Sequence, residues 1–425
     1  MMRWFAFSAY LVCASVAASD IAWKPVTQVT DGRGVRGPWQ QNESNYDYVD
    51  DPSVAIDDAG NMAVVWVDQR GKDVFFQLYS PDTKPTGERI NVSQSPATFS
   101  WLPRVAFAPG NSRQVYILWQ EIIFSGGSHG GDILFARSED AGATFSQPVN
   151  LSRSIAGDGK GRINRDVWHN GSLDIAAGPD GALYAAWTEY EGALWVARSR
   201  DAGQSFAPLV RIEERQPARA PSLALAADGT VYLAWTVGED SAADIRLAKS
   251  TDRGASFAPA QVVEKTRSYS DAPKIVVDRA GILHLAYAES SGGPFERYTV
   301  RYTRSRDGGR SFEPSRRISN VNAAFPSLAV DARGGVYLVC ELFHDDRHRP
   351  RGLGHAVSRD SGRTFSSPAL VPESADPPGH WNGSHQGLLM RKLAVNAAGH
   401  VAVVNSSLRD SHASRVWLMR GEPAN

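Results

Sequence analysis

The sequence is poor in cysteine and has no long apolar segment after its first residues. Of its two cysteines, Cys13 lies in an N-terminal segment that we expect to be removed. The remaining Cys340 cannot form an internal disulfide, and its place in the apolar run Val336–Cys340 is typical of a buried core thiol. No later stretch approaches the ~20 apolar residues of a membrane span. We therefore expect a protein without a membrane span that is stabilised by packing.

The sequence also lacks an excess of either charge and several common catalytic motifs. Lys and Arg number 45 against 46 Asp and Glu, so there is no electrostatic footprint for nucleic acid or an anionic membrane surface. No Gly-rich phosphate loop, nucleophile elbow or Cys-x-x-Cys pair occurs, which argues against nucleotide, α/β-hydrolase and thiol-redox chemistry. No cofactor is predicted.

The N-terminus has the pattern of an export signal. Met1-Met-Arg3 precedes the apolar run Trp4–Cys13, and small residues follow from Ala14 to Ser19. This pattern predicts a signal peptide over residues 1–18 and a periodic, single domain over residues 19–425. The mature protein is expected to be periplasmic or secreted.

One eight-residue phrase, Ser-x-Asp-x-Gly-x-(Thr/Ser)-Phe, occurs five times. Successive copies lie about 50–60 residues apart, the length of four short strands with their turns, which is the size of one propeller blade. Ser and Asp side chains can bond the amides of a tight turn, Gly supplies a positive φ, and Phe anchors the hairpin. The phrase therefore predicts a structural turn and not a catalytic site. The copies begin at Ser138, Ser199, Ser250, Ser305 and Ser358.

A second recurrent element is an alternating apolar strand that follows a polar turn and usually ends in an aromatic residue. It occurs seven times, preceded by another strand and usually followed by a third that runs into the repeated phrase. This order predicts an all-β, seven-bladed β-propeller. The last repeat ends at Arg420 without a fourth strand, and Trp23–Thr30 has the missing pattern. We expect this N-terminal strand to join the last blade and close the ring, which removes two exposed sheet edges.

The repeated phrase resembles the Asp-box (BNR repeat) of the sialidase-like β-propellers. The resemblance covers nearly the whole mature chain and implies a carbohydrate-active propeller. Since the usual sialidase ring has six blades, a six-bladed ring is the alternative.

In this blade order, the start of the first strand and the end of the second strand emerge on the face opposite the repeated phrase. The residues two positions before the recurrent Pro slot of the first strand are predicted to ring the channel mouth. The first five are chemically diverse, which indicates function, and they are Asp50, Trp101, His169, Arg219 and Asp271. Carboxylates also end several second strands. The predicted catalytic carboxylates are Asp50, Asp271, Glu189 and Glu289, and the predicted substrate-binding residues are Arg70, Trp101, His169, Asn170, Tyr190 and Arg219.

Structural roles remain open for several of these residues. Asp50 and Asp51 could cap a turn, Arg219 could pair with Asp271, and Trp101 could belong to the core. A mouth with carboxylates, Arg, His and Trp suits a sugar, because the ring of Trp stacks on a pyranose and two carboxyl groups supply acid, base or nucleophile.

Two resemblances refine this function. Arg219-Ala-Pro221 and Asp68-Gln-Arg70 are similar to segments of the sialidases, which implies a sialidase-like glycoside hydrolase. Trp168-His169-Asn170 resembles the start of a catalytic blade in seven-bladed polysaccharide lyases of the ulvan type. That resemblance implies proton abstraction by His169 or Tyr190 beside a uronate carboxylate that Arg219 neutralises. A non-catalytic propeller that recognises a glycan or a protein is the third reading.

The histidines and aspartates near residue 344 are candidate metal ligands. The segment His344-Asp-Asp-Arg-His348, with His380 and His385, could gather on the mouth side, but its spacing matches no standard site. No metal site is predicted. The expected partner is a glycan or polysaccharide, and the oligomeric state is left open.

Overall fold

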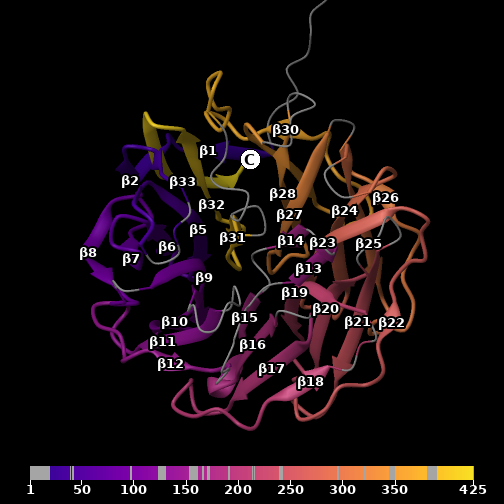
Figure 1. Ribbon diagram of the computed structural model, residues 1–425. Coiled ribbons are helices and arrows are strands. Elements are labelled where there is room, and N and C mark those ends of the chain that lie inside the picture. The colour runs from indigo at the N-terminus through magenta and orange to yellow at the C-terminus, as the bar shows by residue number, and fades with distance from the viewer. Residues whose placement is uncertain are drawn as a thin grey trace, which may run out of the picture.

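The computed structural model describes residues 20–38, 40, 43–95, 98–122, 131–152, 161–164, 167–169, 173–189, 192–212, 214, 216–238, 243–293, 296–319, 322–343, 350–380 and 390–424. Within these ranges the chain is all-β, and its sheets are arranged as the seven blades of a propeller around a central axis (Figure 1). The predicted seven-bladed fold is confirmed. Among the described residues, no helix is long and apolar enough to cross a membrane.

Six blades are four-stranded antiparallel sheets in which the strands follow one another from the axis outward. We call these strands a, b, c and d. The first three blades comprise β5 (Val49–Ile56), β6 (Met62–Asp68), β7 (Asp73–Tyr79) and β8 (Pro85–Asn91); β9 (Phe99–Ala108), β10 (Asn111–Ile122), β11 (Gly131–Ser138) and β12 (Val149–Asn150); and β15 (Leu173–Ala177), β16 (Leu183–Thr188), β17 (Leu194–Ser199) and β18 (Val210–Ile212), with the 3-10 turn η1 (Pro179–Gly181) between β15 and β16.

The next three blades have the same order. They comprise β19 (Ala218–Leu225), β20 (Val231–Val237), β21 (Asp244–Ser250) and β22 (Gln261–Val262); β23 (Tyr269–Val277), β24 (Leu283–Ser290), β25 (Tyr298–Ser305) and β26 (Arg316–Arg317); and β27 (Ala323–Val330), β28 (Val336–Leu342), β29 (Leu353–Ser358) and β30 (Ala369–Leu370).

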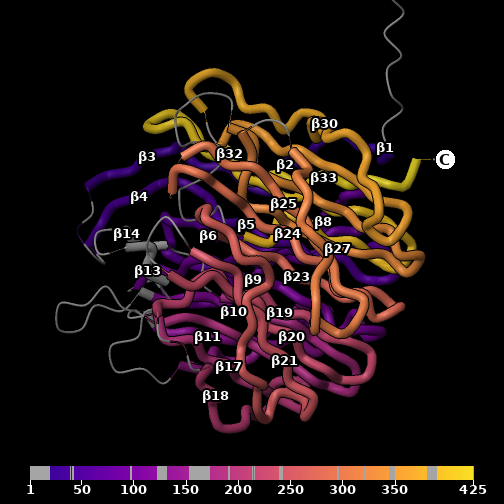
Figure 2. The backbone as a smooth tube through the Cα atoms, turned by 90° about the vertical axis from the view of Figure 1, so that its right-hand side faces the viewer, coloured from indigo at the N-terminus to yellow at the C-terminus, as the bar shows by residue number. Residues whose placement is uncertain are grey.

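The seventh blade combines both ends of the chain. Its first three strands are β31 (Leu393–Val395), β32 (Val401–Arg409) and β33 (Ala413–Pro423), and both β1 (Ile21–Trp23) and β2 (Thr27–Gly32) pair antiparallel with β33. Ile21 lies opposite Pro423 and Thr27 opposite Leu418. The outer edge of the last sheet is thus covered by N-terminal strands. Two short ribbons form sheets separate from the seven blades. The first pairs β3 (Val35–Arg36) with β4 (Tyr46–Asp47) and is visible in Figure 2, and the second pairs β13 (Gly161–Asn164) with β14 (Val167–His169).

The core lies between neighbouring blades. The aromatic residue that ends the apolar pattern of strand b is a fully buried Trp in four blades, and Trp417 of β33 is buried in the seventh. One cluster joins Ala186 of the third blade to Leu223 and Leu233 of the fourth, so the sheets pack face to face. Each buried Trp corresponds to about 4–6 kcal/mol of transfer free energy. The four are Trp66, Trp119, Trp187 and Trp235.

The repeated phrase forms the predicted turn between strands c and d. In the copy that follows β29, the Gly362 amide donates to Ser358 Oγ at 2.8 Å and the Thr364 amide donates to Asp360 Oδ1 at 2.8 Å. Gly362 has φ +75°, and the Phe365 ring packs edge-on against Tyr302 of the preceding blade. Burial opposes the charge of Asp360, but these hydrogen bonds lower its pKa to about 2. The Asp360 carboxylate therefore stabilises the turn as a hydrogen-bond acceptor.

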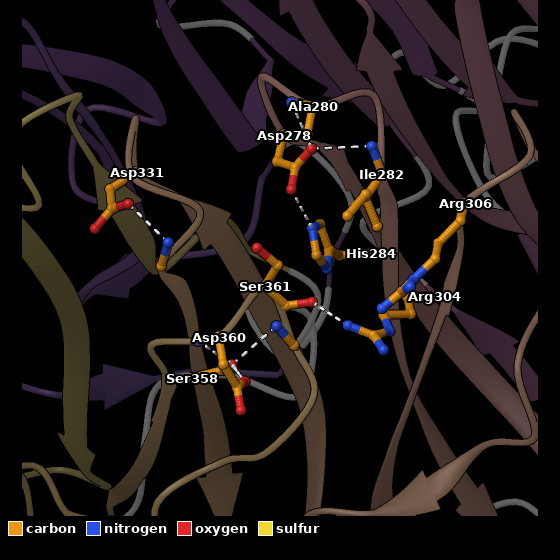
Figure 3. A network of polar contacts seen from close by, with 12 residues as sticks. Asp278, Ala280, Ile282, His284, Arg304, Arg306, Asp331, Ser358, Asp360 and Ser361 are labelled. Atoms are coloured by element: carbon orange, nitrogen blue, oxygen red, sulfur yellow. Dashed lines mark hydrogen bonds and ion pairs between the residues drawn. The ribbon is translucent and has the colours of Figure 1, made fainter.

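The a–b turns lie on the same face and use aspartate in the same way. Asp278 Oδ1 accepts from the amides of Ala280 and Ile282 at 2.9 Å each, while Asp278 Oδ2 lies 3.2 Å from His284 Nε2. Figure 3 shows this turn beside the Asp360 turn, together with Arg304, whose Nη1 donates to the carbonyl oxygen of Ser361. We call this side of the propeller the turn face. The opposite side, which carries the b–c and d–a connections, is the mouth face.

Candidate functional site

A β-bulge recurs where strand a begins on the mouth face. In five blades the residue before the recurrent Pro has a left-handed backbone, with φ between 51° and 59°, and two residues of strand a face one residue of strand b. Such a bulge redirects the preceding side chains. The five bulge residues are Asp51, Leu102, Ala220, Ala272 and Phe325.

The third blade departs from the register that the sequence predicted. Asp174 pairs with Ala186 just as Ser222 pairs with Ala234, so Leu173 takes the place of the recurrent Pro. His169 lies four positions earlier, opposite Gly161 in the separate β13–β14 ribbon. The predicted equivalence of His169 with Asp50 and Arg219 is therefore wrong, because the blade has no Pro to mark the bulge and a ribbon precedes it. The side chain of His169 and all of Asn170 and Tyr190 lie outside the described residues.

Arg219 and Asp271 form a buried pair between the fourth and fifth blades. Arg219 Nε lies 3.3 Å from Asp271 Oδ1, and Arg219 Nη2 donates to Tyr269 Oη at 2.9 Å. Asp271 also accepts from Thr236 Oγ1 at 3.0 Å. Burial lowers the pKa of Arg219, but Asp271 and Tyr269 outweigh it and raise that pKa. With Arg219 0% and Asp271 1% exposed, this placement favours the structural pairing considered for them.

Asp50, Asp51 and Trp101 are also buried near the bulges. Asp50 is 1% exposed and accepts a hydrogen bond from Ser406 Oγ of the seventh blade at 2.7 Å. Burial and the neighbouring Asp50 raise the pKa of Asp51 well above its usual range. Asp51 Oδ1 is buried and has no hydrogen-bond partner in the described part of the chain. Trp101 is 6% exposed and packs in the cluster that contains Leu102 and Met390.

Three other predicted residues lie nearer the surface. Glu289, with a side chain 17% exposed, lies 3.5 Å from Arg301 Nη1, and burial raises its pKa against the opposing effect of Arg301. Glu189 is half-buried, and its amide donates to the Ala193 carbonyl oxygen at 2.8 Å. Arg70, whose side chain is 47% exposed, bonds Asp68 at 2.5 Å.

The structure brings together a group of basic side chains that no repeat of the sequence connects. His380 lies in the d–a connection between the sixth and seventh blades, and its pKa is lowered by burial and then by Arg409, Arg415, His412 and Arg351. These residues come from the β32–β33 hairpin and from the b–c connection of the sixth blade, so all belong to the mouth face. We call His380, Arg351, Arg409, His412 and Arg415 the basic cluster.

A carboxyl group lies within the basic cluster. Asp376 is 4% exposed, its amide donates to the Arg351 carbonyl oxygen at 3.1 Å, and Arg351 Nη2 donates to its carbonyl oxygen at 2.9 Å. Burial raises the pKa of the Asp376 side chain to about 6, against the effects of Ser407 and Arg415. Environments that push the pKa values of neighbouring groups in opposite directions are typical of acid–base sites.

Arg70 is linked to this region through the N-terminal strands. The Ser411 amide in the β32–β33 hairpin donates to the Gly34 carbonyl oxygen at 2.8 Å, and Arg70 Nη2 donates to that of Asp31 at 3.5 Å. The mouth of the sixth, seventh and first blades is therefore rich in Arg. The cluster combines three connections that are far apart along the chain. The sequence therefore indicates only His380, and only as a weak metal candidate.

No group of three or more His, Cys, Asp or Glu side chains able to hold a metal ion occurs among the residues whose placement is described. His344, His348 and His385, which the sequence offered as candidate ligands, lie outside those residues.

No protein-family model matches the chain, and no relative is found among curated proteins. Solved structures do resemble it. An ulvan lyase of polysaccharide lyase family PL25, bound to a glycan of glucuronic acid and sulfated rhamnose, is 11% identical with a TM-score of 0.57 over 92% of this chain and 95% of that chain. A protein of unknown function from Dyadobacter fermentans is 13% identical (TM-score 0.49, 94% and 99% covered). The Hadza microbial sialidase Hz136 is 14% identical (TM-score 0.46, 72% and 65% covered). At these identities the similarity shows the propeller fold alone.

Proposed function

We propose that the protein is a carbohydrate-active propeller that cleaves a uronate-containing polysaccharide on its mouth face by β-elimination. The observation that carries this proposal is the basic cluster, in which three arginines lie near a histidine whose pKa is lowered by burial and then by their charges. A polyanionic chain is attracted to such a concentration of positive charge. The fold similarity to a lyase bound to a glucuronate glycan supports the same substrate class.

The cluster supplies the groups that elimination needs. Neutral His380 removes the proton from the carbon next to the uronate carboxylate, and Arg415 or Arg351 stabilises the negative charge that develops on that carboxylate. The electron pair forms a carbon–carbon double bond as the bond to the glycosidic oxygen on the β carbon breaks. Asp376, with its pKa raised to about 6, donates a proton to the leaving oxygen. The products are an unsaturated uronate end and a new reducing end.

The earlier candidates take different roles in this proposal. Arg219 and Asp271 hold the fourth and fifth blades together, and Arg70 extends the anion-binding surface. His169, Asn170 and Tyr190 stay predicted contacts to the same glycan. The Asp-box resemblance agrees with this class of propeller.

Hydrolysis is the second candidate, favoured by the half-buried Glu289 and its raised pKa. In that case Glu289 would supply one of the two carboxyl groups of a glycosidase. The sialidase-like activity inferred from the sequence falls in this class.

A panel of acidic and neutral polysaccharides, read for both ultraviolet absorbance and reducing ends, separates the two reactions. Elimination produces both signals in parallel, whereas hydrolysis produces reducing ends alone. His380→Gln should lower the rate by about 10²-fold or more, because a general base contributes that much. Arg363→Met, at an exposed turn-face position, is the matched control and should keep the wild-type rate. Reducing ends without ultraviolet absorbance would contradict the elimination mechanism.

A further inference from the structure

A cavity occupies the turn-face end of the propeller axis. It has a volume of about 610 Å³ and is lined by the second halves of all seven a strands and by the a–b turns at Asp57–Ala59 and Pro109–Ser112. It therefore opens on the turn face, away from the basic cluster. Its volume lies in the range of small-molecule sites, ~300–1,000 Å³.

The wall of this cavity combines apolar side chains with polar groups, and it is accessible. Each blade contributes a short aliphatic or aromatic segment of strand a, and several of these side chains are half-exposed although they belong to innermost strands. A ring of such residues binds a hydrocarbon or aromatic body by removing apolar surface from water. Examples from five blades are Ile56, Phe107, Leu225, Val276 and Val330.

The inner end of the cavity is lined by the charged side chains of Asp174, Lys274 and Arg391. Arg391 Nη2 donates to Asp174 Oδ1 at 2.5 Å and to the Ile175 carbonyl oxygen at 2.7 Å. Lys274 occupies the equivalent place of Asp174 on the fifth blade, since both lie opposite strand-b alanines in the same register. Arg104 takes that place on the second blade. Lys274, Arg104 and Arg391 thus interact with Asp174, and Arg104 interacts with Asp51 as well.

Lys274 is the cation most responsive to an added anion. Desolvation and the nearby Arg104 and Arg391 outweigh Asp174 and lower the pKa of Lys274 to about 8. An anion placed beside its ammonium group would stabilise the charged form and raise that pKa. Lys274 lines the cavity and is partly exposed, so its side chain borders the space that a ligand would occupy.

We propose that this cavity binds an organic anion with a compact apolar body, such as a medium-chain or aromatic carboxylate. The acid group faces Lys274 and Arg391, and the apolar body lies along the wall of the a strands. This site is distinct from the glycan site in position, because it opens on the turn face whereas the basic cluster lies on the mouth face.

The test uses decanoate as the probe, decanol as its neutral counterpart, and calorimetry with the full-length protein. Decanoate is expected to bind more tightly than decanol, and Lys274→Met should weaken decanoate binding about tenfold or more, as expected for loss of a charged hydrogen bond. Lys249→Met, a substitution of a lysine on β21 away from the cavity, should leave it unchanged. Ala329→Phe, which fills the channel from the sixth blade, should abolish binding of both probes.

A second readout distinguishes binding at Lys274 from binding elsewhere. At a pH just above 8, decanoate binding should be accompanied by proton uptake in the wild type and by none in Lys274→Met. Melting temperature checks that each variant is folded, and glycan cleavage checks the mouth face separately. The proposal is overturned if decanoate fails to bind the folded wild type, or if Lys274→Met or Ala329→Phe binds it as tightly as the wild type.

Discussion

The two faces of the propeller use carboxylates in opposite ways. On the turn face, Asp201 and Asp360 accept several short local hydrogen bonds that lower their pKa values to about 2. On the mouth face, burial raises the pKa values of Asp51, Glu289 and Asp376, the last to about 6. The same residue type is thus a structural anchor where backbone amides surround it and a candidate acid where they do not. The turn aspartates recur from blade to blade, whereas Asp376 belongs to no repeated segment.

The largest expected change in the free energy of unfolding comes from breaking the buried Arg219–Asp271 pair on the mouth face. Arg219→Met should lower the free energy of unfolding by about 3–5 kcal/mol, because it leaves Asp271 buried without its cation. Arg304→Met is the matched turn-face substitution, since Arg304 pairs with the half-exposed Glu313 at 2.8 Å, and it should cost far less. Urea unfolding monitored by Trp fluorescence gives both values. Equal losses for the two variants would contradict the distinction between the faces.

Asp376 should show the opposite sign of pH dependence from the turn aspartates. Its pKa rises from 3.8 to about 6 on folding, so the native state holds its proton more tightly and stability falls as pH increases across that interval. Asp376→Asn should remove this slope and raise stability at neutral pH by up to about 3 kcal/mol. Free energies of unfolding measured from about pH 4 to pH 7, for the wild type and for Asp376→Asn, test this pH dependence. An unchanged slope in the variant would show that Asp376 is not the group responsible.

The smallest effect concerns a single turn. Asp360→Ala should cost about 1–2 kcal/mol, since the turn loses the acceptor for Thr364 and Ser358. The folded-state pKa of Asp360 is depressed, so its contribution is present above pH 3.8 and is lost as pH falls through about 2. Glycan cleavage should stay at the wild-type rate. A loss of cleavage in the folded variant would place function on the turn face.

The fold was predictable because every blade repeats the same local physics. The Ser-x-Asp-x-Gly phrase and the strand-b pattern each specify contacts within a few residues, and five and seven copies reinforce one another. The arrangement of Arg219 with Asp271 was among the alternatives left open by the sequence, because both occupy one recurrent position in adjacent blades.

The candidate site was much less predictable. The predicted alignment of the third blade with the other blades was wrong, because Leu173 stands at the position of the recurrent Pro and His169 lies in the β13–β14 ribbon. The basic cluster combines Arg351, His380 and the hairpin at 409–415. None of these segments belongs to a repeated sequence pattern. Three connections of different length meet on the mouth face, and sequence spacing gives no measure of that proximity.

The most direct measurement is the proton titration of His380 by NMR, with and without a glucuronate oligosaccharide. In the free protein, the imidazole resonance should titrate below the usual histidine range, because burial and the surrounding arginines disfavour its charge. Bound uronate should offset the arginine charges and move that titration to higher pH. If the oligosaccharide binds and the His380 titration stays where it was, the glycan does not occupy the basic cluster.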